Sequence, residues 1–328
     1  MKLERVGLIV NPRAGRGDAG VIARDAIRAI APRESLVGAG EMGADALRDQ
    51  SPRVFAWSAH TGKARRKFLA QKFADENVDA LVVIGGDGTL ADVALAIIPR
   101  PIPLLGIGAG SANVGPLMTC AHVARLENAR LTTRAVDGLI AGVNDVDLGL
   151  GFNDVVLDFT VLATVNDQIV NVDAAQKMIG ANSPRDPEPV WTSDTRIIKK
   201  FARGETLVAC GDQVATMIVG LPDERFYGKA IAGGAILSSF IGDIAGCLVC
   251  NHLLVTTRLD ADAVHRAEPI ISRYVGLNES DRIEATGLRD GVALCADGNP
   301  LKILCAADRV HVRAQRALAT AIQIEESA

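Results

Sequence analysis

The chain has 328 residues, of which 48% are hydrophobic and 23% charged, a composition that is typical of folded proteins and excludes intrinsic disorder. Its formal net charge of −4 supplies no general positive field for nucleic acid, so we expect no nucleic-acid partner. The chain opens without an apolar signal region, and no run reaches the roughly 18 apolar residues that a membrane span needs, which predicts a cytoplasmic protein without a membrane partner.

The first third of the chain alternates between two hydrophobic periods. Short, continuous apolar runs predict strands over residues 6–10, 53–57, 80–84 and 103–107. Helical patterns follow the first three of these runs, over residues 21–30, 62–76 and 91–97. Strands that alternate with helices predict a Rossmann-like α/β domain with a mostly parallel sheet, and ligands bind such sheets at the carboxyl ends of the strands.

After about residue 130 the pattern changes to short β-type runs. These lie over residues 154–162, 214–219, 247–256, 282–285, 292–295, 309–312 and 320–324. A hairpin turn is predicted over 296–300, and the three prolines within 182–189 predict an exposed loop. We therefore expect two domains, an α/β phosphate-binding domain over residues 1–130 and a β-rich, sandwich-like substrate domain over residues 131–328.

The stretch Gly85-Gly86-Asp87-Gly88-Thr89 directly follows the third predicted strand. Its glycines let the backbone approach a ligand closely, and successive N–H groups beside the positive end of a helix can hold a phosphate. Asp87 does not suit a phosphate, because like charges repel. It suits a hydroxyl whose proton must leave, or a bridging Mg²⁺. The alternative is a tight turn in which Asp87 is the helix N-cap.

Two more glycine-bearing loops follow the first and the fourth predicted strands. Each of them, taken alone, is more often a turn than a site. In a parallel sheet, however, both loops reach the same edge as residues 85–89, and three such loops together favour a phosphate-binding crevice. The residues of these two loops that we expect to contact phosphate are Asn11, Arg13, Gly15, Gly108, Gly110, Ser111 and Asn113.

These motifs are similar to those of the superfamily that joins NAD kinases and diacylglycerol-type lipid kinases. They are Asn-Pro-x-x-Gly after the first strand, Gly-Gly-Asp-Gly-Thr after the third and a glycine-rich loop after the fourth. In the second half, residues 151–157 resemble the segment that opens the β domain of NAD kinases, and residues 232–236, 251–254 and 296–312 resemble later segments of that family. Residues 40–43 and the Asp that ends Gly-Gly-Asp-Gly-Thr-x-x-Asp are similar to the divergent branch called the acetoin-cluster X type.

The resemblance implies an ATP- and Mg²⁺-dependent kinase that transfers a phosphoryl group to a hydroxyl of NAD or of a related nucleotide. ATP would lie on the glycine loops, and Asp87 would orient or deprotonate the acceptor hydroxyl. Asn153 and Asp154 would hold adenine or ribose hydroxyls, although a plain β-turn at the start of a strand is an alternative for this pair. The resemblance also implies a dimer or tetramer. It leaves open whether ATP or polyphosphate is the donor.

One segment departs from the NAD kinase pattern. Residues 221–228 replace the small hydroxyl-bearing residues that help to hold the acceptor dinucleotide in that family. Two other functions therefore stay open. A lipid or small-alcohol kinase is suggested by residues 108–113, which also resemble the Gly-Ser-Gly-Asn loop of sphingolipid kinases, and a non-catalytic nucleotide-binding regulator is suggested by the altered segment.

Three further features are weaker. Cys247 and Cys250 have the spacing of a redox or zinc pair, but no second pair follows them, so we expect buried core thiols and predict no protein metal site. His252 is expected to have a structural role. The basic residues of the predicted helix over 62–76 are expected to form a solvated face.

Overall fold

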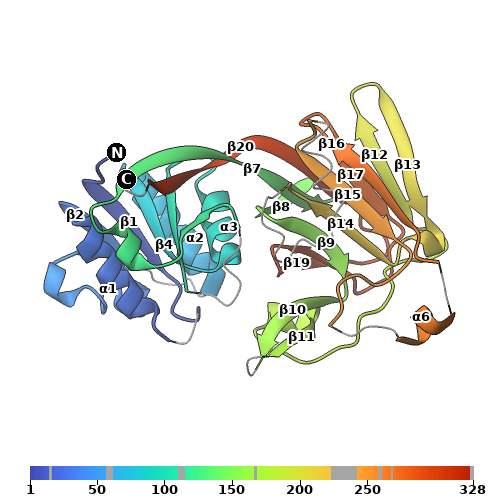
Figure 1. Ribbon diagram of the computed structural model, residues 1–328, viewed down its shortest axis with the longest axis horizontal. Helices are drawn as coiled ribbons and strands as arrows, with labels where there is room; N and C mark the ends of the chain where they lie inside the picture. The colour runs from blue at the N-terminus through green and yellow to red at the C-terminus, as the bar shows by residue number, and fades with distance from the viewer. Residues whose placement is uncertain are drawn as a thin grey trace. The chain divides into compact units, whose positions relative to one another are not determined.

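The computed structural model describes residues 1–14, 17–56, 62–109, 115–165, 168–222, 242–257, 261–266 and 269–325 (Figure 1). The chain divides into two compact units. The first unit comprises residues 1–136 together with 317–328, and the second comprises residues 137–316. Two strands, β7 (Arg130–Val143) and β20 (Val310–Glu325), each have residues in both units.

The first unit is built on a parallel sheet with the strand order β3-β2-β1-β4-β5. The strands are β1 (Arg5–Val10), β2 (Glu34–Gly38), β3 (Arg53–Phe55), β4 (Ala80–Gly85) and β5 (Leu104–Gly108). Both β6 (Met118–Cys120) and the last part of β20 pair with β5, also in parallel. The order in which the chain adds strands reverses between β1 and β4, because β2 and β3 lie on one side of β1 and β4 and β5 lie on the other. Ligands of doubly wound sheets bind at this switch point.

Helices cover both faces of this sheet. The helix α1 (Ala19–Ile30) contacts β1 and β4, and its Ala23 shares a hydrophobic core with Val6, Leu8 and Val10 of β1. Residues of a strand alternate between the two faces, so Gly7 faces the other side, where Phe73 of α2 would lie 2.6 Å from a Cβ at position 7. The remaining helices of this unit are α2 (Gly62–Asp75), α3 (Asp87–Ala96), η1 (Gly40–Met42), η2 (Arg48–Gln50) and η3 (Val123–Leu126).

The second unit is a β-sandwich of antiparallel strands. One sheet has the order β16-β15-β14-β9-β18-β19, and the other contains β13, β12, β17 and the first part of β20, with β7 and β8 beside it. Inward-facing residues of both sheets, such as Leu157 of β9 and Val312 of β20, form one hydrophobic core. The described part of the chain therefore confirms the predicted fold class, an α/β parallel-sheet region followed by a β-rich region.

The elements of the second unit have the following bounds. The first seven strands besides β7 are β8 (Val146–Gly151), β9 (Asp154–Asp158), β10 (Thr160–Val165), β11 (Gln168–Asp173), β12 (Arg196–Phe201), β13 (Gly204–Cys210) and β14 (Thr216–Gly220). They are followed by β15 (Ala245–Cys250), β16 (Ser272–Leu277), β17 (Arg282–Thr286), β18 (Ala293–Ala296) and β19 (Asn299–Ile303). The helices are α4 (Ala174–Met178), η4 (Gly211–Gln213) and α6 (Ala261–Arg266).

Several elements differ from the sequence prediction. The run over 154–162 is two strands, β9 and β10, which belong to different sheets and meet at Phe159. The run over 247–256 ends as a strand at Cys250, and the runs over 309–312 and 320–324 are parts of one long strand, β20. The segment 182–189 is not fully exposed, because Arg185 lies over the Phe159 ring and pairs with two carboxylates.

The predicted hairpin turn over 296–300 is confirmed. It joins β18 to β19 through Asp297 and Gly298, whose φ angles of 47° and 70° are those of a two-residue hairpin turn with both central residues left-handed. Within the residues that the structure describes, no helix has the length and apolar character needed to cross a membrane.

Candidate functional site

The loop after β1 meets the first turn of α3 at the switch point of the first unit. The backbone N–H of Asn11 donates to the carbonyl oxygen of Ile84 over 2.9 Å, which ties the loop to β4. The side-chain Nδ2 of Asn11 donates to Oγ1 of Thr89, also over 2.9 Å. Two segments that the sequence placed at one sheet edge are thus joined by direct hydrogen bonds.

The helix α3 begins earlier than its hydrophobic pattern predicts. Its N-cap is Gly86, so Asp87 is the first helical residue, and Gly88 and Thr89 lie in the first turn. The alternative that made Asp87 the N-cap is therefore wrong. Two early glycines lower helix propensity, which is why the sequence pattern points to a start near residue 91, but packing against β4 and β5 overrides that local preference. The first turn of a helix points backbone N–H groups outward at its positive end, as anion binding requires.

The carboxylate of Asp87 is held by a second loop. Its Oδ1 accepts a hydrogen bond from the backbone N–H of Gly115 over 3.0 Å, and Asp87 is half-buried. Gly115 lies between β5 and β6, so this contact links the start of α3 to the segment that follows β5. A carboxylate oriented by a backbone N–H at a sheet edge can accept a proton or orient a hydroxyl.

Gly85 allows this close packing. A Cβ at position 85 would lie 2.8 Å from both Cβ and Oγ1 of Thr89, which is closer than real Cβ atoms approach their neighbours. A side chain at the end of β4 would therefore push the first turn of α3 away from the strand. The glycine at this position is explained by packing inside the protein as well as by access for a ligand.

The remaining predicted residues of the first unit are placed as follows. Arg13 is exposed, and its backbone N–H donates to Oδ1 of Asn11 over 3.2 Å. Gly108, expected in a loop, is instead the last residue of β5 and is half-buried. Next to it, the N–H of Ala109 donates to the carbonyl oxygen of Gly85 over 3.0 Å, so the ends of β4 and β5 are joined. Four predicted residues lie outside the described residues, namely Gly15, Gly110, Ser111 and Asn113.

Asn153 and Asp154 belong to the second unit. Asn153 lies in the turn between β8 and β9 and is 6% exposed, whereas Asp154 is half-buried and begins β9. The N–H groups of both residues donate to the carboxylate of Asp297 in the hairpin turn between β18 and β19. A turn at the start of a strand is therefore present, and ligand binding by this pair stays a prediction.

Asp297 was missed as part of a candidate site. Burial raises the pKa of its carboxyl group to about 7, and the nearby charge of Asp154 adds to that, against the lowering effect of three backbone N–H groups. In the sequence, the Asp-Gly pair indicates a hairpin turn and residues 296–312 carry part of the family resemblance, but neither signal shows what the Asp side chain contacts.

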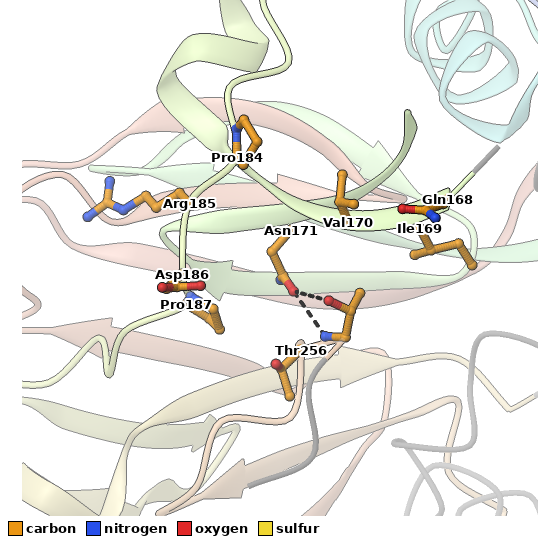
Figure 2. Close-up of a pocket in the computed structure, with 10 residues that line it drawn as sticks. Gln168, Ile169, Val170, Asn171, Pro184, Arg185, Asp186, Pro187 and Thr256 are labelled. Atoms are coloured by element: carbon orange, nitrogen blue, oxygen red, sulfur yellow. Dashed lines mark hydrogen bonds between the residues drawn. The ribbon is translucent and has the colours of Figure 1, made fainter. Parts of the chain in front are cut away.

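A separate cavity of about 500 Å³ lies in the second unit (Figure 2). Its wall includes Asn171, whose Oδ1 accepts a hydrogen bond from the N–H of Thr257 over 3.0 Å. Arg185 lines the cavity too, but Asp173 and Glu188 already neutralise its charge. None of the residues that the sequence predicts to bind a ligand lines this cavity. Its lining residues are Gln168, Ile169, Val170, Asn171, Pro184, Arg185, Asp186, Pro187, Thr256 and Thr257.

The cysteine pair and His252 lie in the second unit. Cys247 and Cys250 are buried, as expected, and burial raises the pKa of the Cys247 thiol to about 12, which leaves it protonated at neutral pH. His252 is half-buried, with Nδ1 3.3 Å from the Oδ1 of Asn251. Across the ranges that the structure describes, no group of three or more His, Cys, Asp or Glu residues could hold a metal ion.

The basic face of α2 is not simply solvated, contrary to expectation. The Arg66 side chain is only 12% exposed, and its guanidinium lies 3.4 Å from Oδ2 of Asp92 on α3. Lys67 approaches the other oxygen of Asp92 at 3.8 Å. Sequence reading missed this because the charges of α2 meet a partner on a different helix.

Residues 5–138 match the family model for the diacylglycerol kinase catalytic domain. An uncharacterised protein of Archaeoglobus fulgidus is 32% identical over 302 residues, which cover 91% of this chain and 92% of that protein. An NAD kinase of Nitrosomonas eutropha is 29% identical over 92 residues, 28% of this chain and 26% of that enzyme. An NAD kinase of Syntrophotalea carbinolica is 34% identical over 111 residues, 30% of this chain and 37% of that enzyme.

Two solved structures share the fold at low sequence identity. The yeast NADH kinase complexed with NADH gives a TM-score of 0.56 at 14% identity and covers 99% of this chain and 84% of its own. A protein assigned as a diacylglycerol kinase from Bacillus anthracis strain Sterne gives 0.53 at 15% identity, covering 98% of this chain and 99% of its own.

Proposed function

Because this chain belongs to the superfamily that joins diacylglycerol kinases and NAD kinases, we propose that it is an ATP-dependent kinase that phosphorylates a hydroxyl group of NAD or of a related nucleotide. Membership makes the chain a kinase of this superfamily, and the identity of the acceptor is the proposal. The observation that supports phosphoryl transfer to a hydroxyl group is the position of Asp87. This carboxylate begins the helix at the switch point of a doubly wound sheet and is oriented by the N–H of Gly115.

The phosphates of ATP are bound at the carboxyl ends of β1 and β4. The first turn of α3 directs N–H groups and the positive end of the helix dipole toward them. The hydrogen bond between the side chains of Asn11 and Thr89 holds the loop after β1 against the first turn of α3. Arg13 is exposed beside this loop and can neutralise phosphate charge.

Asp87 orients the acceptor hydroxyl and accepts its proton as the oxygen attacks the phosphoryl group. Phosphoryl transfer depends on positioning and on neutralisation of charge more than on covalent chemistry. One fixed carboxylate is therefore enough for the role that the protein must supply.

The donor set of the crevice fits Mg²⁺. This ion is usually held by one or two carboxylates together with substrate phosphates and water, so a cage of protein ligands is not required. Asp87 is the carboxylate that would hold it, and the ion would neutralise phosphate charge there.

In the second unit, Asn153 and Asp154 bind the nucleoside part of the acceptor. Both present oxygen acceptors, which suit the amino group of adenine and the hydroxyls of ribose. The assignment of residues 1–130 to phosphate binding and of 131–328 to substrate binding stays a prediction, as does a dimer or tetramer. The altered segment 221–228 lies outside the described residues from position 223 onward.

The acceptor can be identified with purified protein and Mg-ATP. ADP release is followed with NAD, NADH, a diacylglycerol, a sphingoid base or no acceptor, and a parallel series replaces ATP with polyphosphate. Release that requires a dinucleotide supports the proposal. Release only with a lipid alcohol supports a lipid kinase, a reading favoured by the diacylglycerol kinase match over residues 5–138. Nucleotide binding without turnover with any acceptor supports a regulator.

Replacement of Asp87 tests its role. We expect Asp87→Asn to lower kcat by about 100-fold or more, because general-base catalysis typically contributes 10²–10⁴, while affinity for ATP measured without Mg²⁺ changes less than about threefold. Asp75→Asn is the matched control, since Asp75 is a half-exposed carboxylate of the same unit that pairs with Arg100 on the surface. Near-normal turnover by Asp87→Asn would show that another group handles the hydroxyl proton.

A further inference from the structure

The turn between β8 and β9 is bound to one carboxylate. Oδ2 of Asp297 accepts the N–H of Phe152 over 2.8 Å, and Oδ1 accepts the N–H groups of Asn153 and Asp154 over 2.7 and 3.2 Å. In return, the N–H of Asp297 donates to the carbonyl oxygen of Asp154 over 3.1 Å. Three consecutive residues thus have their N–H groups directed at a single side chain. The backbone of Asp297 also bonds to this turn, through its own N–H.

The segment that follows β14 also bonds to this turn. The N–H of Leu221, just beyond β14, donates to the carbonyl oxygen of Asn153 over 3.0 Å. The backbone of Asn153 is therefore held by both its N–H and its C=O. Its side chain is nearly buried, yet among the described residues its Oδ1 has no hydrogen-bond partner. A buried acceptor without a partner costs free energy, and a ligand donor can supply the missing bond.

A carboxylate is a costly choice if it serves only to make the hairpin. The left-handed turn at Asp297 and Gly298 requires two residues that tolerate positive φ, and Asn-Gly meets that need as well as Asp-Gly does. The ionised group at 297 lies near Asp154, so it carries both a desolvation cost and a like-charge repulsion. What the carboxylate adds over an amide is an acceptor for all three N–H groups at once. The carboxylate of Asp297 therefore stabilises the turn formed by residues 152–154.

We propose that Asp297 is a positioning residue that fixes the turn Phe152–Asp154, so that Asn153 and Asp154 present their oxygen acceptors to the nucleoside part of a nucleotide ligand. Acceptors on two consecutive residues suit a ligand rich in donors, such as an amino-substituted base on a ribose with free hydroxyls. This inference rests on the proposed function for the identity of the ligand, and it acts on binding rather than on the chemical step.

The test measures binding and turnover in the full-length protein. Asp297→Asn keeps the shape of the side chain but turns an N–H donor toward one of the three backbone N–H groups. We expect the Kd and the KM for NAD to rise by about tenfold, the equivalent of about 1.4 kcal/mol, while kcat and the KM for ATP change less than about threefold. We also expect preference for NAD over its deaminated analogue, whose base lacks the amino group, to fall. Asp297→Glu should restore part of the affinity.

The control is Asp290→Asn in the same unit. Asp290 is exposed and accepts a single backbone N–H, that of Ala306, over 2.6 Å. Asp290→Asn should leave the Kd for NAD unchanged, although this substitution also removes a carboxylate that accepts a backbone N–H.

A second readout is the pH dependence of NAD binding without ATP. Protonation of Asp297 would convert an accepting oxygen into a donor, and Asp154 is the carboxylate that faces it. In the wild type we expect the Kd for NAD to rise as the pH falls through about 7, and in Asp297→Asn we expect this dependence to disappear.

The outcomes separate the inference from the proposed function. If Asp297→Asn lowers thermal stability but leaves the Kd for NAD and its pH profile as in the wild type, Asp297 is purely structural and the inference is overturned. If the wild type transfers no phosphoryl group to NAD yet binds it in an Asp297-dependent way, the proposed function fails while the positioning role is upheld. If the wild type binds no adenine nucleotide, the ligand assignment is overturned, even where hydrogen exchange shows the amides of 152–154 released in Asp297→Asn.

Discussion

A single carboxylate, that of Asp308, joins the turn between β7 and β8 to residues 302–305. Oδ1 of Asp308 accepts from Nδ2 of Asn144 over 2.7 Å and from Nζ of Lys302 over 3.0 Å, and Oδ2 accepts the N–H of Cys305 over 3.0 Å. The Cys305 N–H, with smaller effects from Lys302 and Asn144, lowers the pKa of Asp308 to about 2 against the opposing effect of burial. These bonds are stronger to the ionised carboxylate than to the protonated group.

The lowered pKa makes stability depend on pH in a defined direction. The carboxylate takes up a proton more readily in the unfolded chain, so its contribution is complete above the ordinary pKa of about 4 and is lost as the pH falls through about 2. We expect Asp308→Asn to lower the midpoint of thermal unfolding at pH 7. The difference in midpoint between this variant and the wild type should be smaller at about pH 3 than at pH 7. Melting curves across this range check it, and a gap of constant size would contradict the role of the charge.

At the scale of elements, α2 and α3 are joined by charges that are mostly withdrawn from water. The side chain of Asp92 is 11% exposed and faces Arg66 and Lys67 of α2. Removal of one partner from such a cluster leaves the others poorly solvated and unpaired, which is more harmful than loss of a surface pair. This contact supports α3, the helix that carries Asp87.

We therefore expect Asp92→Asn to lower the free energy of unfolding by about 1–3 kcal/mol, measured by urea unfolding. Asp75→Asn, which breaks the exposed pair with Arg100, should change it by less than about 1 kcal/mol. The combination of Arg66→Met with Asp92→Asn should cost less than the sum of the two single changes. If Asp92→Asn and Asp75→Asn change the free energy of unfolding equally, the charges of Asp92, Arg66 and Lys67 are as well solvated as the surface pair of Asp75 and Arg100.

At the scale of the whole molecule, the chain returns to the first unit at its end. Residues 317–328 belong to that unit although residues 137–316 form the other. Within β20, Ala321 pairs with Leu104 of β5, and both Ala321 and Ile322 are fully buried. The parallel sheet of the first unit is therefore completed by residues that lie about 200 positions after β5, and contacts of such separation are costly in chain entropy.

Truncation after residue 316 should consequently damage the first unit. We expect a lower melting temperature and faster hydrogen exchange in β5, because the truncation uncovers β5 and removes Ile322 from the core around Val82 and Ile107. Deletion of residues 326–328 alone, which follow β20, is the control and should leave exchange in β5 unchanged. Protection of β5 that survives the longer truncation would mean that β20 adds little to this sheet.

Prediction from the sequence succeeded where local pattern and final environment agree. The continuous apolar runs of β1, β4 and β5 are buried on both faces, so their composition alone identifies them. The strand β2 was missed, because Glu34-Ser35-Leu36-Val37-Gly38 has only a short apolar stretch between polar and glycine residues. Strands of the sandwich such as β12, with its Arg196 and Lys199, were missed for a similar reason, since their polar side chains break the apolar pattern.

The candidate site divides in the same way. The types of residue at its centre, a glycine-flanked Asp87 after a buried strand and a polar loop at Asn11, follow from the sequence because each lies directly after a recognisable strand. That α3 begins at Asp87 depends on packing against β4 and β5. That Asn11 bonds Thr89 and that Asp297 holds the turn at Asn153 depend on partners 78 and 144 positions apart in the sequence.

Periodicity and glycine spacing are local properties that a chain carries in any state, so the fold class, the glycine-rich motifs and the superfamily follow from the sequence. Which carboxylates are oriented, which are buried and which side chain supports which turn became known from the folded structure alone. The physical reason is that hydrogen bonds and desolvation depend on neighbours in space, and folding brings those neighbours from distant parts of the chain.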